Sequence, residues 1–231
     1  MAHCPLVNPD VVRRAPLFAT LDDEAASEVI ASSTPVRMER GDVLFHEGDQ
    51  GDRLYVITEG KIKLGRTSPD GRENLLAILG PSEMLGELSL FDPGPRTATA
   101  TAVAETQLLG LGNEQLQQLL VAHPRIGGTL LAALARRLRR TNENLADLVF
   151  TDVPGRVAKA LLELSERFGR PVEEGTMVAH DLTQEELAQL VGASRETVNK
   201  ALADFATRGW LRLENRAVLL TDVDRLQRRA R

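Results

Sequence analysis

The chain has little of the chemistry that metal and redox centres need. Of its 231 residues, one is a cysteine and four are histidines. The single cysteine, Cys4, excludes an internal disulfide and a cysteine-ligated iron–sulfur cluster within one chain. The histidines are scattered and show no metal-ligand spacing, so we expect no bound metal.

Long apolar runs are also missing. No stretch of 18 apolar residues is present, so the sequence predicts no membrane span. The first ten residues lack a basic stretch followed by an apolar core, and we expect a cytoplasmic protein without a secretory signal. Residues 151–231 carry 13 basic and 13 acidic side chains, which leaves the net charge of −5 in residues 1–150. Any nucleic-acid contact must therefore come from a local arrangement of charges.

One long helical pattern dominates what is present, over about residues 125–150. Its seam positions follow each other at spacings of 3, 4, 3, 4 and 3, an a/d heptad pattern: Leu131, Leu134, Leu138, Thr141, Leu145 and Leu148. A helix of this length spans about 38 Å, and its seam requires a partner helix. The polar pair Thr141 and Asn142 interrupts the leucines. It either fixes the register of a dimer or contacts a ligand.

The residues before this helix predict short helices over 10–33 and then a β domain. Glycines separate short runs with strand character, at residues 43–45, 54–58, 62–66, 75–79, 97–103 and 107–111. Many short strands between turns favour a small antiparallel barrel or jelly roll. A helix over 113–121 follows and ends before Pro124.

A helix-turn-helix is predicted over residues 183–206. Thr183 and Glu186 form a capping box, Gly192 permits a tight turn, and Ser194 caps a second helix. The second helix directs apolar side chains inward and carries polar side chains on its opposite face: Arg195, Glu196, Asn199 and Lys200. A plain helical hairpin with a solvated charged face is the alternative. The side-chain types favour base reading, because Arg suits guanine, Glu suits cytosine, and Lys suits guanine or phosphate.

The segments on either side of this motif complete the expected DNA-binding domain. Residues 151–155 form a hinge, where Asp152 or Thr151 caps a helix that Gly169 ends. Residues 170–180 are expected to be a loop or short strand. Residues 210–214 and 217–221 predict a hairpin wing. The four arginines within residues 225–231 are expected to be a solvated end.

The residues GASRETVNK at 192–200 resemble the recognition helix of the cyclic-AMP receptor/fumarate–nitrate regulator superfamily. The resemblance extends over about residues 14–225 and is closest to the actinobacterial cyclic-AMP receptor proteins (GlxR type). It implies an α+β protein: a cyclic-nucleotide-binding antiparallel β-barrel (jelly roll) at 1–123, a coiled-coil dimerisation helix at 124–150, and a winged helix-turn-helix at 151–231. It also implies a DNA-binding set: Thr183, Ser194, Arg195, Glu196, Thr197, Asn199 and Lys200. Lys200 departs from the arginine of the enteric branch, and Lys lacks the fork that grips a base twice.

The residues GELSLF at 86–91, followed by Pro95, Arg96 and Thr97, resemble the phosphate-binding cassette of the same family. The chemistry fits, because an Arg and backbone N–H groups suit a cyclic phosphate and Glu87 can accept the ribose 2′-OH. The resemblance places the purine against Thr141 and Asn142 of the dimer helix. The complete predicted set for cyclic AMP is Leu64, Leu76, Gly86, Glu87, Leu88, Ser89, Arg96, Thr97, Thr141 and Asn142.

Together with this resemblance, the sequence predicts a homodimeric, cyclic-AMP-responsive regulator that is not an enzyme. The resemblance implies that it binds palindromic TGTGA-like DNA, works with RNA polymerase, and activates or represses. Three alternatives remain at this point. The first is a regulator of the same fold that responds to cyclic GMP or to no nucleotide. The second is a barrel-fold metal enzyme, which needs converging histidines that residues 34–111 do not offer. The third is a pure dimerisation module, which the base-reading helix disfavours.

Overall fold

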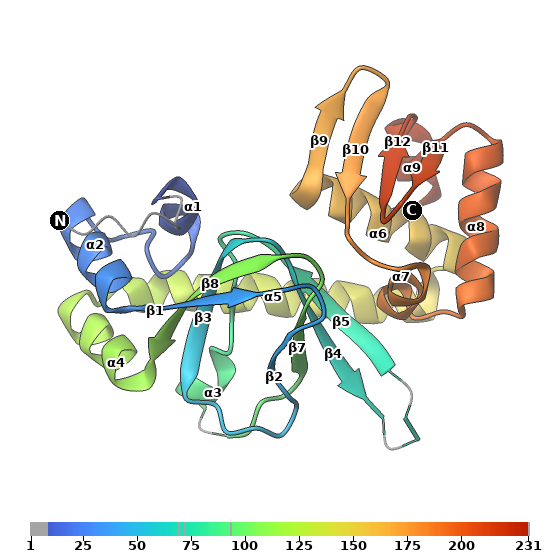
Figure 1. Ribbon diagram of the computed structural model, residues 1–231. Helices are drawn as coiled ribbons and strands as arrows, with labels where there is room; N and C mark the ends of the chain where they lie inside the picture. Colours follow the sequence, from blue (N-terminus) through green and yellow to red (C-terminus); the bar gives the residue numbers. More distant parts are fainter. Residues whose placement is uncertain (1–8, 69, 72, 93, 231) are drawn as a thin grey trace. The chain divides into compact units, whose positions relative to one another are not determined.

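The computed structural model describes residues 9–68, 70–71, 73–92 and 94–230 (Figure 1). It divides into two compact units. The first comprises residues 1–66 and 77–139, and the second comprises residues 67–76 and 140–231. Each unit is described by itself below. The domain boundaries at residues 123 and 150 stay predictions.

The strands of the N-terminal part form two four-stranded antiparallel sheets. One has the order β1 (Thr34–Met38), β8 (Thr106–Gly112), β3 (Arg53–Glu59), β6 (Met84–Leu85). The other has the order β2 (Val43–Phe45), β7 (Thr99–Ala102), β4 (Ile62–Thr67), β5 (Glu73–Leu79). The predicted antiparallel class is confirmed. Within the described strands the sheets stay separate rather than closing into one barrel.

The core between these strands follows from their alternation. In β7 the side chains of Ala100 and Ala102 are buried, while Thr99 and Thr101 between them are half-buried. This is the period of two that the sequence shows. The inner faces contribute large aliphatic residues to one core cluster: Ile57, Ile62, Leu64, Leu79, Leu85 and Leu108. That cluster fixes the strands whose ends carry the predicted nucleotide site.

Helices pack against the sheet that contains β3 and β8. The helices α1 (Pro9–Arg14), α2 (Asp23–Ser32) and α4 (Asn113–Ala122) belong to this part of the chain. Their apolar side chains share a core cluster with β3, β8 and the first turns of α5 (Arg125–Phe150), where Ile126 and Leu130 are buried. The Thr129 hydroxyl also donates to the Pro16 carbonyl at 2.6 Å. The start of α5 is thus fixed in the first unit.

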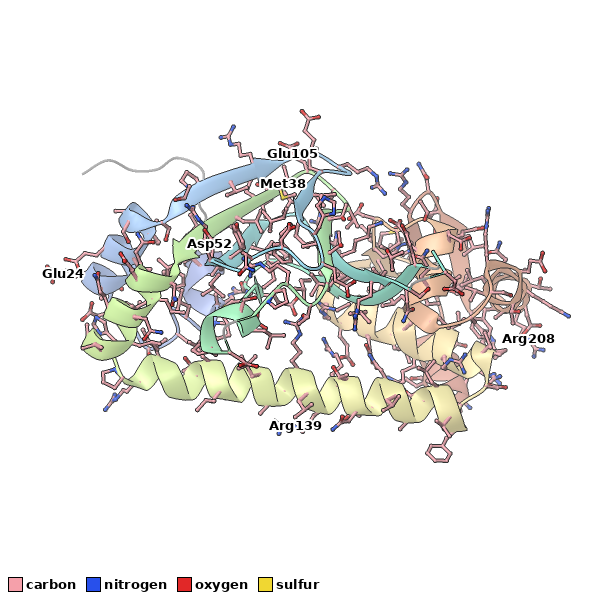
Figure 2. All side chains as sticks on the ribbon, turned by 90° about the horizontal axis from the view of Figure 1, so that it is seen from below. Glu24, Met38, Asp52, Glu105, Arg139 and Arg208 are labelled. Atoms are coloured by element: carbon pink, nitrogen blue, oxygen red, sulfur yellow. The ribbon has the colours of Figure 1, made fainter. Side chains whose placement is uncertain are left out.

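The helix α5 confirms the predicted long helix, and Figure 2 shows it as one uninterrupted element with Arg139 about halfway along. Its seam leucines are mostly exposed: Leu131, Leu138, Leu145 and Leu148. Leu138, for example, keeps 62% of its surface exposed. An apolar stripe of this length, unburied within one chain, is typical of a surface that pairs with another helix.

The second unit begins with α6 (Val153–Phe168), which Asp152 rather than Thr151 caps: the Gly155 N–H donates to Asp152 Oδ1 at 3.0 Å. A four-stranded sheet lies beside α6, in the order β11 (Leu211–Glu214), β12 (Ala217–Leu220), β10 (Gly175–Ala179), β9 (Gly169–Val172) (Figure 1). The wing β11–β12 is confirmed. Residues 170–180, expected to be a loop or short strand, form most of a second hairpin that widens the wing.

The arginine-rich tail corrects a prediction. It is not a solvated end but the helix α9 (Val223–Arg229), which packs on α6. Asp222 caps the helix through the Arg225 N–H, and Leu226 is fully buried. Arg229 pairs with Asp152 at 2.6 Å. The buried Leu226 side chain anchors this helix. The prediction failed because it considered the number of arginines and not the apolar residue among them.

Candidate functional site

Residues from separate strands and from α5 line one hollow in the first unit. The lining residues are Phe45, Leu64, Leu85, Gly86, Glu87, Leu88, Ser89, Arg96, Thr97, Ala98 and Arg137. They come from β2, β4 and β6, the short helix α3 (Leu88–Phe91), the segment before β7, and α5. Seven of the ten residues predicted for the nucleotide are among them. The lining also includes the aromatic ring of Phe45 and the guanidinium of Arg137, which the sequence did not predict.

Two glycines let the chain close tightly around this hollow. Gly86 has a φ of 83°, and a Cβ there would lie 2.5 Å from Arg96 Nη1 and 2.7 Å from the Arg53 carbonyl oxygen. A Cβ at Gly51 would lie 2.2 Å from the Cβ of Ser89. Any larger residue at either place would displace the guanidinium or α3.

Arg96 is the central cation of the site. Its side chain is buried, with 4% exposure, and donates to the carbonyls of Gly86 at 2.9 Å and Arg53 at 2.8 Å. Its guanidinium carbon lies 4.3 Å from the centre of the Phe45 ring, a cation–π distance. Burial lowers the pKa of Arg96. Its Nε has no partner among the described residues, so a buried positive charge retains a donor that an anion could satisfy.

Glu87 supplies a complementary acceptor. It is 3% exposed, and one carboxylate oxygen accepts from Arg137 Nη1 at 2.8 Å. The other oxygen, Oε2, is buried without a partner in the described structure. A carboxylate oxygen in this position can accept a hydroxyl proton. Arg137 lies four residues before Thr141, on the same helix face, a spacing that could have drawn attention to it.

Three predicted nucleotide contacts do not line the hollow. Leu76 is 46% exposed, because side chains alternate along β5 and its neighbour Leu75 is buried. Leu76 also belongs to the part of the chain grouped with the second unit, and its contact with a nucleotide stays a prediction. Thr141 and Asn142 lie exposed on α5, in the part grouped with the second unit. Their contact with a purine stays a prediction.

The helix-turn-helix has the predicted local structure. The Glu186 N–H donates to Thr183 Oγ1 at 3.1 Å, and the Thr183 N–H donates to Glu186 Oε2 at 2.8 Å, which starts α7 (Gln184–Val191). Gly192 ends α7 with a φ of 69°. The Thr197 N–H donates to Ser194 Oγ at 3.2 Å, at the start of α8 (Arg195–Thr207). The Thr183 hydroxyl therefore caps the start of α7, and the Ser194 hydroxyl caps the start of α8.

The face of α8 divides as the sequence predicts, with one difference. Val198, Leu202 and Phe205 are buried, and Phe205 stacks on Trp210 at 5.3 Å between ring centres. The predicted reading residues Arg195, Glu196 and Lys200 are exposed and make no hydrogen bond or ion pair within the described chain. Asn199 is half-buried, and its Oδ1 has no partner among the described groups. Three side chains are therefore free to contact DNA.

Two features of the described residues bear on the other function classes. Across the described residues, no helix combines the length and apolar character needed to cross a bilayer. The same residues contain no group of three or more His, Cys, Asp or Glu side chains that could hold a metal ion.

Comparison with protein families assigns both units. Residues 35–123 match the cyclic nucleotide-binding domain, which includes the hollow around Arg96. Residues 155–229 match the Crp-like helix-turn-helix domain, which includes α7, α8 and the wing.

Relatives extend this similarity over nearly the whole chain. A "CRP-like cAMP-activated global transcriptional regulator" of Mycobacterium tuberculosis is 57% identical over 222 residues, which cover 96% of this chain and 99% of that protein. The "Cyclic AMP receptor protein" of Thermus thermophilus is 38% identical over 87% of this chain and 90% of its own. The solved "c-di-GMP Responsive Global Regulator CLP" of Xanthomonas campestris has a TM-score of 0.74 and 28% identity, covering 86% of this chain and 99% of its own. The chain belongs to the CRP/FNR family of transcription regulators.

Proposed function

We propose that this chain is a cyclic-AMP-responsive transcription regulator that binds palindromic TGTGA-like DNA as a homodimer. The observation that carries the proposal is the hollow in which Arg96 and Glu87 are both buried and each retains an unused polar atom. A cation and a hydroxyl acceptor at one site suit a ligand that carries both a phosphate and a ribose. The relatives named for activation by cyclic AMP support the choice of nucleotide.

The chemistry of binding follows from these side chains. The cyclic phosphate carries one negative charge and accepts from the Arg96 guanidinium, which compensates the cost of burying that cation. The ribose 2′-OH donates to Glu87 Oε2, while Arg137 holds the other oxygen of the same carboxylate. Leu64 and Ala98 give the hollow its apolar wall. The purine contacts Thr141 and Asn142, contributed from the paired α5 helices.

Dimerisation uses the exposed stripe of leucines on α5. Pairing two such helices buries the stripe, and Thr141 then lies in the seam with Asn142 beside it. Ligand that contacts both helices favours one arrangement of the dimer over another, which is a population shift. The two α8 helices must then lie about 34 Å apart to enter successive major grooves on one side of DNA.

Several expectations from the sequence belong to the same proposal. The chain acts by binding DNA and is not an enzyme, it is cytoplasmic, and RNA polymerase is its partner at promoters. Arg195, Glu196 and Lys200 read bases, and Thr183 and Ser194 contact the DNA backbone beside them.

A DNA-binding titration tests the proposal directly. The duplex is TGTGA-N6-TCACA, with a scrambled duplex as control, and each is titrated without nucleotide, with cyclic AMP and with cyclic GMP. We expect cyclic AMP to tighten binding to the specific duplex by about 5-fold to 150-fold, the usual range of allosteric coupling. The alternative, a regulator of the same fold with another effector, predicts specific binding that cyclic AMP leaves unchanged.

A further inference from the structure

One arginine in the second unit bonds to three backbone carbonyls at once. Arg156 lies in the first turn of α6. Its Nη1 donates to the Thr151 carbonyl at 2.7 Å, its Nε to the Val191 carbonyl at 3.0 Å, and its Nη2 to the Gly192 carbonyl at 3.2 Å. Thr151 directly follows the last residue of α5, and the other two carbonyls end α7 in the turn between α7 and α8. A single side chain therefore joins the end of the long helix to the turn of the DNA-binding motif.

A second contact lies at the same place. A Cβ built on Gly192 would lie 2.8 Å from Cδ2 of Leu148, so the backbone of the turn lies directly against the last turns of α5. Leu148 is also one of the seam leucines and keeps half its surface exposed. Glycine suits this position because its φ of 69° is left-handed, and any Cβ here would force the end of the Leu148 side chain to move.

The chemistry of arginine suits this junction. The last carbonyls of a helix have no intrahelical donor, and a cation near them also interacts favourably with the helix dipole. The guanidinium presents its donors in a rigid planar fork, which allows bonds in three directions. A lysine ammonium would reach the carbonyls only as a point charge on a flexible stem. The turn that these bonds fix is followed at once by Ser194 and α8.

We propose that Arg156 is a positioning residue for DNA recognition: it fixes the helix-turn-helix turn to the end of α5, so that the separation of the two recognition helices follows the dimer helix. The proposal rests on the proposed function, because it concerns how a dimer measures its DNA site. It does not give Arg156 any contact with bases or with nucleotide. Replacing Arg156 should therefore change which spacing between two half-sites the dimer prefers. It should not change the affinity for a single half-site.

The test uses the full-length protein and the variants Arg156→Lys and Arg156→Gln. The matched control is Arg167→Lys, near the other end of α6, whose guanidinium lies over the neighbouring Phe168 ring at 4.8 Å. Each protein is titrated with a single TGTGA half-site and with palindromes whose spacer is N6 or one base pair shorter or longer. The titrations are run with and without saturating cyclic AMP, alongside thermal unfolding and calorimetric nucleotide affinity.

We expect wild type and Arg167→Lys to prefer one spacing clearly. Arg156→Lys should keep its nucleotide affinity and its affinity for the single half-site, while its preference among spacings falls by about tenfold. Arg156→Gln should show at least the same loss. Thermal unfolding measures any damage to folding separately, because a folding defect lowers half-site affinity as well.

Two results would overturn the proposal. If the Arg156 variants weaken half-site and palindrome equally, the arginine supports the fold or contacts DNA itself. If they keep the wild-type spacing preference, the carbonyl contacts do not position α8. Failure of the proposed function looks different: wild type would then show no nucleotide effect in any titration, while the spacing comparison without nucleotide still tests Arg156.

Discussion

The functional residues of the hollow differ from ordinary surface charges in their burial. Arg96 bonds to two carbonyls, stacks on Phe45 and still has an unused Nε. No carboxylate neutralises it directly by an ion pair in the described chain, since Glu87 pairs with Arg137 instead. A buried cation without an anionic partner is costly to keep unless a ligand supplies the charge.

Arg96→Leu should therefore abolish detectable binding of cyclic AMP. The loss of a charge-assisted bond to a buried phosphate should cost more than about 2 kcal/mol. Calorimetry measures the affinity, and thermal unfolding checks that the variant folds. Arg66→Leu is a suitable control, because Arg66 pairs with Glu47 at the surface. An unchanged affinity in Arg96→Leu would place the nucleotide elsewhere.

In the second unit, two arginine substitutions should weaken DNA binding in different ways. Arg195→Ala should cost about 1–3 kcal/mol on the specific duplex and relax discrimination at one base pair, because Arg suits two-point contact with guanine. Arg216→Gln, on the wing turn, should weaken all duplexes alike and lower the salt slope by about one unit, as a phosphate contact does. Titrations at several salt concentrations separate the two. Equal weakening on specific and scrambled duplexes would show that Arg195 touches the backbone.

At the scale of helices and strands, the elements with a clear period of apolar residues were predicted correctly from the sequence. The helix α5 has the bounds that its heptad pattern indicates, and the six predicted strand segments all coincide with strands. The structure adds β1 and β6, which the sequence pattern hid. β1 contains Pro35 and has few buried positions, and β6 has only two residues, too few to show a period. Short elements like these depend on pairing with neighbours rather than on their own sequence.

The candidate site was predictable only where it is local in sequence. Glu87 and Arg96 lie within ten residues of each other, inside a stretch that resembles a known motif. Phe45 and Arg137 join them from β2 and α5, far away along the chain, and no local pattern links them to that stretch. Tertiary packing brought these residues together, so the structure was needed to find them.

The tail helix α9 allows a test of why the solvated-end prediction failed. Leu226→Ala should lower the free energy of unfolding of the second unit by about 2–5 kcal/mol, because the fully buried leucine leaves a cavity against α6. Chemical denaturation measures the loss. Gln227→Ala, exposed on the same helix, is the control and should change little. If the Leu226 variant were as stable as the control, α9 would not contribute to the stability of the second unit.

The helix α6 carries a carboxyl group whose environment predicts a pH effect. Burial raises the pKa of Glu163 above its ordinary value of 4.5, against the smaller opposing influence of Arg140, Lys159 and Arg167. A raised folded-state pKa stabilises the fold while the group is protonated, and this stabilisation is lost as pH rises through that pKa.

Glu163→Gln should therefore increase the free energy of unfolding at pH 7, because it removes a partly desolvated charge. Below the unfolded pKa of 4.5 both proteins are neutral at this position, so the difference should disappear. Denaturant titrations across that range measure it. Glu166→Gln, on the exposed face of α6, serves as the comparison. A variant less stable than wild type at pH 7 would mean that the ion pairs outweigh the burial.

At the scale of the whole molecule, the α5 helix contributes residues to both units. It begins packed on the first unit through Ile126 and Leu130 and ends beside the helix-turn-helix turn through Leu148. Its leucine stripe is exposed within one chain, which is the surface proposed to pair with a second chain. One element therefore carries the proposed dimer contact, the predicted purine contact and the end of the junction proposed for Arg156, so we expect a change in its pairing to affect all three.

Thr141 and Asn142 interrupt the leucine stripe, and replacing both should affect dimerisation and ligand binding in opposite directions. The double variant is Thr141→Leu with Asn142→Ala. A leucine in the seam should stabilise the dimer, because burying a side chain of that size is worth about 1.5–3 kcal/mol. The same change removes the groups proposed to meet the purine, so cyclic AMP should bind more weakly and shift DNA affinity less. Analytical ultracentrifugation measures the dimer, and calorimetry with DNA titration measures the response. Glu143→Ala, exposed beside the pair, is the control. A double variant that dimerises less tightly and keeps its full ligand response would show that Thr141 and Asn142 serve the register of the dimer and not the ligand.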